Sequence, residues 1–164
     1  MMLKKKFRIL RNLICTIGLI IISPFLFFAA LMIIIEDGMP VFFIQERIGK
    51  NNIIFKIIKI RTLKTDAPNT GTHQLDKKYQ LICGKFFRKI KLDEFPQLIN
   101  VLMGDINLIG PRPGLTSQKE LTKFRSANGV YEIKPGITGL SQVLGYDMSD
   151  PLKLAEIDKL YIEN

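Results

Sequence analysis

The sequence predicts an α+β (α/β) protein, in which one N-terminal membrane helix precedes a small, mostly helical domain with a short β-hairpin. Three observations support this fold class. Residues 13–35 form an apolar run without a charged residue, two later segments are rich in β-branched residues, and further apolar residues recur at helical spacing. A chain of 164 residues has room for one membrane segment and one small domain. We therefore expect residues 1–36 to form a basic head and membrane helix, and residues 37–164 to form a separate small domain.

The apolar run is long enough to span a bilayer, but a Ser-Pro pair interrupts it. Its residues would span roughly 34 Å as a helix, and a bilayer core is about 30 Å thick. Pro24 lacks an N–H and its ring clashes with the carbonyl of Ile20, so a helix through it must kink, and Ser23 can hydrogen-bond a freed carbonyl. Two readings stay open on these residues alone: a kinked spanning helix, and a helix bent sharply enough to return to the side it entered from.

The distribution of charge indicates on which side of the membrane the chain begins. The formal net charge is +9, and five positive charges precede the apolar run: Lys4, Lys5, Lys6, Arg8 and Arg11. By the positive-inside rule the N-terminus is cytoplasmic, and the basic head suits anionic membrane lipid. No aromatic residues are interleaved with a basic stripe, so a nucleic-acid partner is not expected.

The two cysteines and the single histidine exclude several kinds of site. Cys15 lies in the apolar run and Cys83 in the domain, and neither has the spacing of a disulfide framework or a Cys/His metal site. A reducing, cytoplasmic location fits this usage. His73 lies in the polar stretch "TDAPNTGTHQLDKK", where we expect a solvated loop residue rather than a catalytic base.

The segments "MPVFFIQERIG" and "NIIFKIIKIRTL" predict two strands joined by a Gly-Lys-Asn-Asn turn. Alternation along the second strand places Ile57, Lys59 and Arg61 on one face. Two cations on one face are typical either of an edge strand protected by charge or of a phosphate site. The pattern does not choose between them.

Three further segments predict helices. "KKYQLICGKFFRKIKL" is amphipathic and basic, as expected of a helix packed on the core or lying on a membrane surface. "TSQKELTKF" offers a capping box from Ser117 to Glu120, and "SDPLKLAEIDKLYIEN" offers Asp150 as cap and Pro151 as first helical residue. Between the last two, "YEIKPGITGLSQV" predicts a Pro-Gly turn followed by a short strand or loop.

The stretch "LDEFPQLINVLMGDINLIGPRPG" carries the residues best suited to chemistry. Apolar spacing and Pro96 predict a helix that starts near Glu94, with Asp93 and Glu94 at its N-terminus. Ionised carboxylates are favoured there, and both could reach one bound cation. Plain capping of the helix is the alternative.

The downstream "GPRPG" presents Arg112 between two prolines. Pro111 and Pro113 fix φ on both sides and hold the guanidinium on a stiff backbone, which suits a bidentate phosphate contact. An ordinary Pro-rich turn with an exposed Arg would have the same sequence pattern.

In this order, "RIG", "FKIIKIRT", "LDEFPQLINVLMGDINLIGPRP" and "KPGITGLSQV" resemble the bacterial sugar transferase family, the monotopic phosphoglycosyl transferases. The chain is especially similar to the small members that start N-linked protein glycosylation. The resemblance implies that an aspartate attacks the β-phosphate of a UDP-sugar, releases UMP and passes a phosphosugar to polyprenol (undecaprenyl) phosphate. It implies that residues 37–164 form the catalytic domain, with Asp93 as nucleophile, Glu94 as its partner and Mg²⁺ at this pair.

Further roles follow from the resemblance alone. It implies substrate contacts from Arg112 in the Pro111-Arg112-Pro113 motif, phosphate contacts from Lys59, Arg61 and Arg88, and an acidic position at Asp158. It also implies a re-entrant membrane helix broken at Ser23-Pro24, which places the active site at the cytoplasmic face of the bacterial inner membrane. The partners would be the two substrates, membrane lipid and downstream glycosyltransferases of glycoprotein or polysaccharide synthesis.

The sequence departs from the family pattern at two places, and two competing hypotheses remain. Family members usually continue beyond the equivalent of Asn164, and the usual "FRT" reads "IRT" at Ile60. The competing hypotheses are a non-catalytic membrane adaptor of the same fold, binding lipid carrier or partner enzymes, and a kinked single-span anchor with an external domain. The sequence does not predict which UDP-sugar is used.

Overall fold

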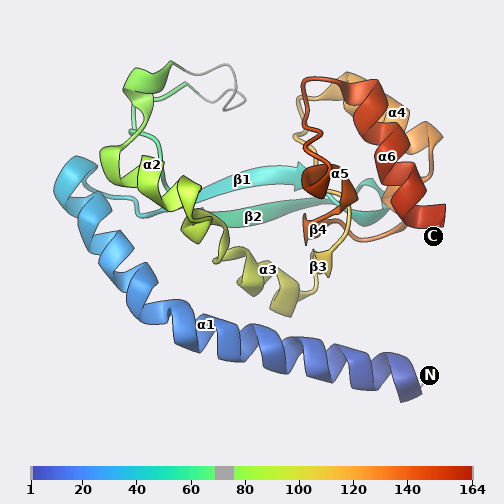
Figure 1. Ribbon diagram of the computed structural model, residues 1–164, viewed down its shortest axis with the longest axis horizontal. Coiled ribbons are helices and arrows are strands. Elements are labelled where there is room, and N and C mark those ends of the chain that lie inside the picture. Colours follow the sequence, from blue (N-terminus) through green and yellow to red (C-terminus); the bar gives the residue numbers. More distant parts are fainter. Residues whose placement is uncertain (1, 69–75, 164) are drawn as a thin grey trace. The chain divides into compact units, whose positions relative to one another are not determined.

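A computed structural model describes residues 2–68 and 76–163 of the chain, so His73 lies outside the described residues. Two compact units divide the chain. The first comprises Met1–Ile44 and Ile58–Leu98, and the second comprises Gln45–Ile57 and Ile99–Asn164. Helices dominate the described residues, and the strands found there form two two-stranded sheets (Figure 1). The predicted domain boundary after residue 36 remains a prediction.

The first unit begins with α1, Met2–Asp37, a single helix with Pro24 inside it. As expected, the hydroxyl of Ser23 donates a hydrogen bond to the carbonyl of Ile20, at 2.8 Å. Figure 1 shows α1 bending near its middle, and the helix continues through Pro24. The change of direction is thus a bend within one helix and not an interruption of it.

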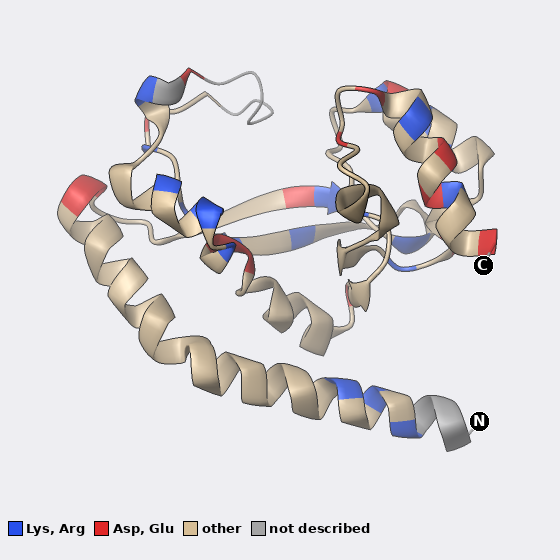
Figure 2. Ribbon diagram, viewed as in Figure 1, with Lys and Arg blue, Asp and Glu red and all other residues tan. Residues whose placement is uncertain are grey.

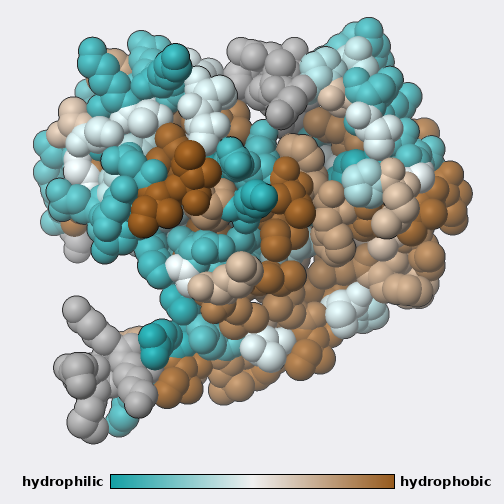
Figure 3. All heavy atoms as spheres, turned by 180° about the vertical axis from the view of Figure 1, so that it is seen from behind, coloured by the Kyte–Doolittle hydropathy of each residue, from teal (hydrophilic) through white to brown (hydrophobic). Residues whose placement is uncertain are grey.

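Among the described residues, α1 alone is long and apolar enough to cross a membrane, judged by length and composition. Most of its apolar side chains are exposed, for example Ile20 at 66% and Ile35 at 85%. Figure 3 shows apolar side chains along this helix. The exposure separates α1 from the core helix of a globular domain, whose apolar side chains would be covered.

The last turns of α1 pack into the core of the first unit. Ala29 and Ile33 are buried together with Val41 and Ile60 of the hairpin region and Phe87 of α2, Ile82–Lys89. Burying these side chains fixes the end of α1 against the elements that follow it.

The predicted hairpin is confirmed, with strands β1, Phe42–Ile48, and β2, Ile54–Ile60, in one antiparallel sheet. Between them the short 3₁₀ helix Lys50–Asn52 makes the turn, and Asn51 and Asn52 have positive φ values of 55° and 59°. Asn tolerates this left-handed conformation better than most residues, which explains why this turn carries two of them.

The predicted helix start near Glu94 is wrong by three residues. Asp93 and Glu94 lie in a 3₁₀ turn, Leu92–Glu94, and the helix α3 is Gln97–Met103. The amide of Phe95 donates to the carbonyl of Leu92 at 3.3 Å, an i→i+3 bond, and Pro96 has no N–H with which to continue the turn into the helix.

In the second unit, α4, Lys119–Ala127, and α6, Pro151–Glu163, lie side by side with Leu121, Leu154 and Ala155 buried together (Figure 1). Asp150 caps α6 as expected, since its carboxylate accepts a hydrogen bond from the amide of Lys153 at 3.0 Å. The capping box of α4 is wrong, because Gln118 occupies the N-cap position without a side-chain cap bond. The short helix α5, Leu140–Val143, and the 3₁₀ turn Val130–Glu132 complete this unit.

A parallel pair that the sequence did not predict closes the second unit. The strand β3, Asn107–Ile109, pairs with β4, Gly136–Thr138. The backbones come so close that a Cβ on Gly136 would lie 2.2 Å from the amide nitrogen of Gly110. Only glycine fits there, which gives the "GPRP" and "KPGITG" motifs a packing reason beyond any catalytic one.

We expect Gly136→Ala to lower the free energy of unfolding by about 3 kcal/mol, because the methyl group would meet backbone that cannot move aside alone. Thermal unfolding in detergent measures the loss. Gly114→Ala is the matched control, since its Cβ would lie 3.4 Å or more from the nearest side-chain atoms. Equal stability of the two variants would contradict the packing reason.

Candidate active site

The acidic pair sits in the 3₁₀ turn between α2 and α3, beside basic residues (Figure 2). Asp93 is 8% exposed. The amine of Lys59, on β2, lies 3.1 Å from Oε1 of Glu94, and both side chains are largely covered. Arg88, on α2, donates from Nε to the hydroxyl of Thr62 at 2.7 Å. The first unit thus brings together four of the residues that the sequence predicted: Lys59, Arg88, Asp93 and Glu94.

Electrostatics make Asp93 an unusual carboxyl. Burial raises its pKa, Lys59 lowers it, Glu94 raises it and Arg88 lowers it, with a net rise above the ordinary value of an aspartate. Its Oδ1 is buried and accepts no hydrogen bond within residues 2–68 and 76–163. A buried acceptor without a donor costs stability, and such strained carboxyl groups occur preferentially at functional sites.

Asp93→Asn is expected to stabilise the protein at neutral pH in the presence of EDTA. The folded pKa of Asp93 lies above the unfolded one, so the folded state binds the proton more tightly. The stabilising contribution is fully present below the unfolded pKa and is lost as the pH rises through the folded pKa. At neutral pH the wild-type chain therefore carries the cost of a buried charge, which Asn removes.

Thermal unfolding at several pH values measures this effect. The melting temperature of Asp93→Asn should exceed that of the wild type at pH 7, and the difference should shrink toward acid pH. Asp66→Asn, at an exposed position, should leave the melting temperature unchanged. A lower melting temperature for Asp93→Asn at pH 7 would contradict the raised pKa.

Arg61 does not lie with Lys59 in the cluster around the acidic pair. The strand β2 ends at Ile60, so the alternation that should place Lys59 and Arg61 on one face stops before Arg61. Arg61 is 5% exposed and binds the carboxylate of Asp37 and, at 2.5 Å, the carbonyl of Gly38. The phosphate contact implied for Arg61 stays a prediction. In this structure its guanidinium binds the chain at the end of α1.

Sequence reasoning did not single out Gln97. It is 2% exposed, and its Nε2 is buried without a hydrogen-bond partner among the described residues. It follows Asp93 by four residues, so one turn of helical spacing was the available signal.

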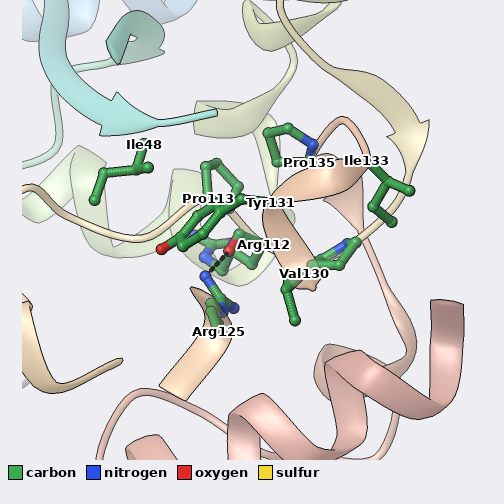
Figure 4. A pocket seen from close by; sticks show the side chains of 9 residues that line it. Ile48, Arg112, Pro113, Arg125, Val130, Tyr131, Ile133 and Pro135 are labelled. Carbon is green, nitrogen blue, oxygen red and sulfur yellow. Dashed lines mark hydrogen bonds between the residues drawn. The ribbon is translucent and has the colours of Figure 1, made fainter. Parts of the chain in front are cut away.

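The Pro-Arg-Pro motif belongs to the second unit. Pro111 and Pro113 are buried and Arg112 is half-buried. The carbonyl of Arg112 accepts a hydrogen bond of 2.8 Å from Nη1 of Arg125, a contact drawn in Figure 4. These residues line a small pocket together with Ile48, Val130, Tyr131, Ile133 and Pro135 (Figure 4). The backbone of Arg112 is therefore held in two ways, by the prolines on both sides and by the buried guanidinium of Arg125.

Asp158 is the partner of that guanidinium. Its Oδ2 accepts from Nε of Arg125 at 2.9 Å and from Nη2 at 2.5 Å, and both side chains are 1% exposed. One oxygen of the Asp158 carboxylate, Oδ2, is thus occupied by Arg125 inside the unit. Its place in the structure is that of a positioning residue for Arg125, and the substrate contact implied by resemblance stays a prediction.

A magnesium ion fits the chemistry of the acidic pair. Among the described residues no three His, Cys, Asp or Glu side chains cluster, so a site built from protein ligands alone is not present there. Mg²⁺ commonly binds one or two carboxylates together with substrate phosphates. Asp93, with its unpartnered Oδ1, and Glu94 supply that number of carboxylates.

Comparison with known proteins agrees with the motifs. A family model described as bacterial sugar transferase matches residues 3–164. The chain is 36% identical over 142 residues to the uncharacterized sugar transferase EpsL of Bacillus subtilis, covering 87% of this chain and 70% of EpsL. It is 38% identical over 127 residues to a UDP-glucose:undecaprenyl-phosphate glucose-1-phosphate transferase of Caulobacter vibrioides, covering 75% and 48% of the two chains.

A third relative has a different sugar in its name. The chain is 35% identical over 159 residues to a UDP-N-acetylgalactosamine-undecaprenyl-phosphate N-acetylgalactosaminephosphotransferase of Aeromonas hydrophila, covering 93% of this chain and 38% of that protein. The chain thus spans less than half the length of the Caulobacter vibrioides and Aeromonas hydrophila relatives.

Proposed function

The chain belongs to the bacterial sugar transferase family, and from this premise we propose that it transfers a phosphosugar from a UDP-sugar to undecaprenyl phosphate. The observation that supports this most is the buried carboxylate of Asp93, which has an unpartnered oxygen and two cations acting on it. The named relatives from Caulobacter vibrioides and Aeromonas hydrophila support the same reaction class. The product would be an undecaprenyl-diphosphate sugar, made in the first membrane step of glycoconjugate synthesis.

The reaction proceeds in two displacements at phosphorus. A carboxylate oxygen of Asp93 attacks the β-phosphorus of the UDP-sugar, the bond from that phosphorus to the bridging oxygen breaks, and UMP leaves with the electron pair. An oxygen of undecaprenyl phosphate then attacks the phosphorus of the aspartyl-phosphosugar, and Asp93 leaves as a carboxylate. Each step forms one P–O bond and breaks one.

The residues around Asp93 have separate tasks in this scheme. Arg88 and Lys59 place positive charge where the transferred phosphate gathers negative charge. Lys59 also holds Glu94 by their ion pair of 3.1 Å. Mg²⁺, held by Asp93 and Glu94 with substrate phosphates, would offset the charge on the leaving UMP. The substrate contact that the resemblance implies for Arg112, which belongs to the second unit, remains part of the proposal.

We propose that α1 is re-entrant, so that the active site lies at the cytoplasmic face where UDP-sugars are made. The basic residues at its start and its bend support this arrangement (Figures 1 and 2). Asp66→Cys, in a chain whose own cysteines are replaced by Ser, tests it with a membrane-impermeant maleimide. No labelling of intact cells and full labelling of opened cells is expected, and labelling of intact cells would support a spanning helix with an external domain.

The reaction itself is tested by UMP release from the purified chain in nanodiscs with undecaprenyl phosphate and Mg²⁺. The donor panel begins with UDP-glucose and UDP-N-acetylgalactosamine, the sugars named in the relatives. Release with one donor, lost in EDTA, is expected. Binding of a UDP-sugar without release of UMP would favour the adaptor hypothesis instead.

A further inference from the structure

The two last residues of α1 are acidic, and they bind two different elements of the first unit. Figure 2 shows this acidic end beside the start of α2. Glu36 reaches α2, and Asp37 reaches the chain just after β2. We call Glu36 and Asp37 together the α1 clamp. The reaction scheme gives neither residue a task.

Glu36 caps α2 from 46 residues away. Its Oε1 accepts the amide of Ile82 at 2.6 Å and its Oε2 accepts the amide of Cys83 at 3.0 Å. The local N-cap residue, Leu81, offers no side-chain cap. The first amides of a helix need acceptors and its positive end favours a carboxylate, so α2 depends on α1 for its N-terminal cap.

Asp37 secures the other element. Its carboxylate accepts from the guanidinium of Arg61 and from the amide of Thr65, the latter at 3.0 Å. Arg61 also bonds the carbonyl of Gly38 and, through its own amide, is bonded to the carbonyl of Val41 at 2.8 Å. The end of β2 is therefore fixed to the end of α1 by a largely buried ion pair.

The two elements held in this way carry the cations of the candidate active site. Lys59 lies on β2, two residues before Arg61, and Arg88 lies in the last turn of α2. A backbone contact joins the two elements as well, because the amide of Leu81 donates to the carbonyl of Thr62 at 3.1 Å, and the Thr62 hydroxyl accepts from Arg88.

We propose that Glu36 and Asp37 are positioning residues through which the membrane helix sets the places of Arg88 and Lys59 around Asp93. The active site would then be held in a fixed relation to α1, the element that seats in the bilayer. The catalytic part of this inference rests on the proposed function, whereas the structural part does not.

The test compares Glu36→Gln with Glu36→Asp and Glu46→Gln in the full chain in nanodiscs. Gln loses the charge and half of the bidentate acceptor, Asp keeps the charge on a shorter stem, and Glu46 is exposed on β1. Two readouts are used: hydrogen exchange of the peptide covering α2, and kcat and KM for UMP release.

For Glu36→Gln we expect exchange in α2 to accelerate about tenfold, as for loss of a charge-assisted hydrogen bond. We expect kcat to fall by about 10–100-fold through misplaced cations, with KM for the donor little changed. Glu36→Asp should restore part of the exchange protection of α2 and part of kcat, and Glu46→Gln should match the wild type in both.

Unchanged exchange in Glu36→Gln would overturn the inference, and so would faster exchange with kcat unaffected, because Glu36 would then only cap α2. If Glu36→Gln does not fold, the same two readouts on Glu36→Asp decide, with intermediate effects expected. Absence of UMP release from the wild-type chain would contradict the proposed function, and exchange in α2 would still show whether Glu36 holds that helix.

Discussion

Asp93→Asn is expected to lower UMP release by about 10³-fold or more, since an amide cannot act as the nucleophile and no other group can replace it. The neighbouring Glu94 is held by Lys59 at 3.1 Å and is not expected to substitute. The measurement is single-turnover UMP release with saturating donor. The variant should fold at least as well as the wild type, so a lost signal will not reflect unfolding.

Two comparisons make this prediction specific. Asp66→Asn, the same change at an exposed position, should retain full activity. Donor binding, measured by isothermal titration, should survive Asp93→Asn within a few fold, because Arg88 and Lys59 remain. UMP release from Asp93→Asn near the wild-type rate would remove Asp93 from the mechanism.

Asp158→Ala should lower the free energy of unfolding by about 3–5 kcal/mol, the cost of leaving a buried charge without its partner. Arg125 is 1% exposed and would keep only its bond to the carbonyl of Arg112. Chemical denaturation in detergent measures the loss. Lys153→Ala, which breaks an exposed ion pair with Glu156 on the same helix, is the control and should change stability by less than about 1 kcal/mol.

The double variant Arg125→Met/Asp158→Leu separates structure from substrate contact. Replacing a buried ion pair with apolar side chains is often neutral or stabilising, so this variant should recover most of the lost stability. Arg125→Met also removes the bond from Arg125 to the carbonyl of Arg112. UMP release that recovers together with stability would exclude a direct substrate contact by Asp158, and recovered stability without recovered release would show that Asp158 or Arg125 is needed for the reaction itself.

Sequence patterns predicted the local elements well. The hairpin followed from β-branched runs around a turn that needs positive φ at Asn51 and Asn52. The start of α6 followed from Asp150 and Pro151, since capping depends on neighbouring residues only. Helical spacing and strand alternation singled out Asp93, Glu94 and Lys59 as candidates. Their roles, and that of Arg88, came from the motif resemblance and stay predictions.

Long-range pairing escaped prediction. The parallel strands β3 and β4 are three residues each, and their close approach depends on Gly110 and Gly136, which are far apart in the sequence. Arg61 was misplaced because the end of β2 was not visible in its apolar pattern. The cap that Glu36 provides to the amide of Ile82 crosses 46 residues, so no local rule for helix starts could find it.

In the proposed mechanism Asp93 carries the phosphosugar during transfer. The most direct test of this step incubates the chain with a donor labelled with ³²P in the β-phosphate, without undecaprenyl phosphate, and measures the label on the denatured protein. We expect label on the wild-type chain, mapped to the peptide with Asp93 and discharged by undecaprenyl phosphate, and none on Asp93→Asn. Label that persists on Asp93→Asn, or UMP release by the wild type without any label on the protein, would contradict this mechanism.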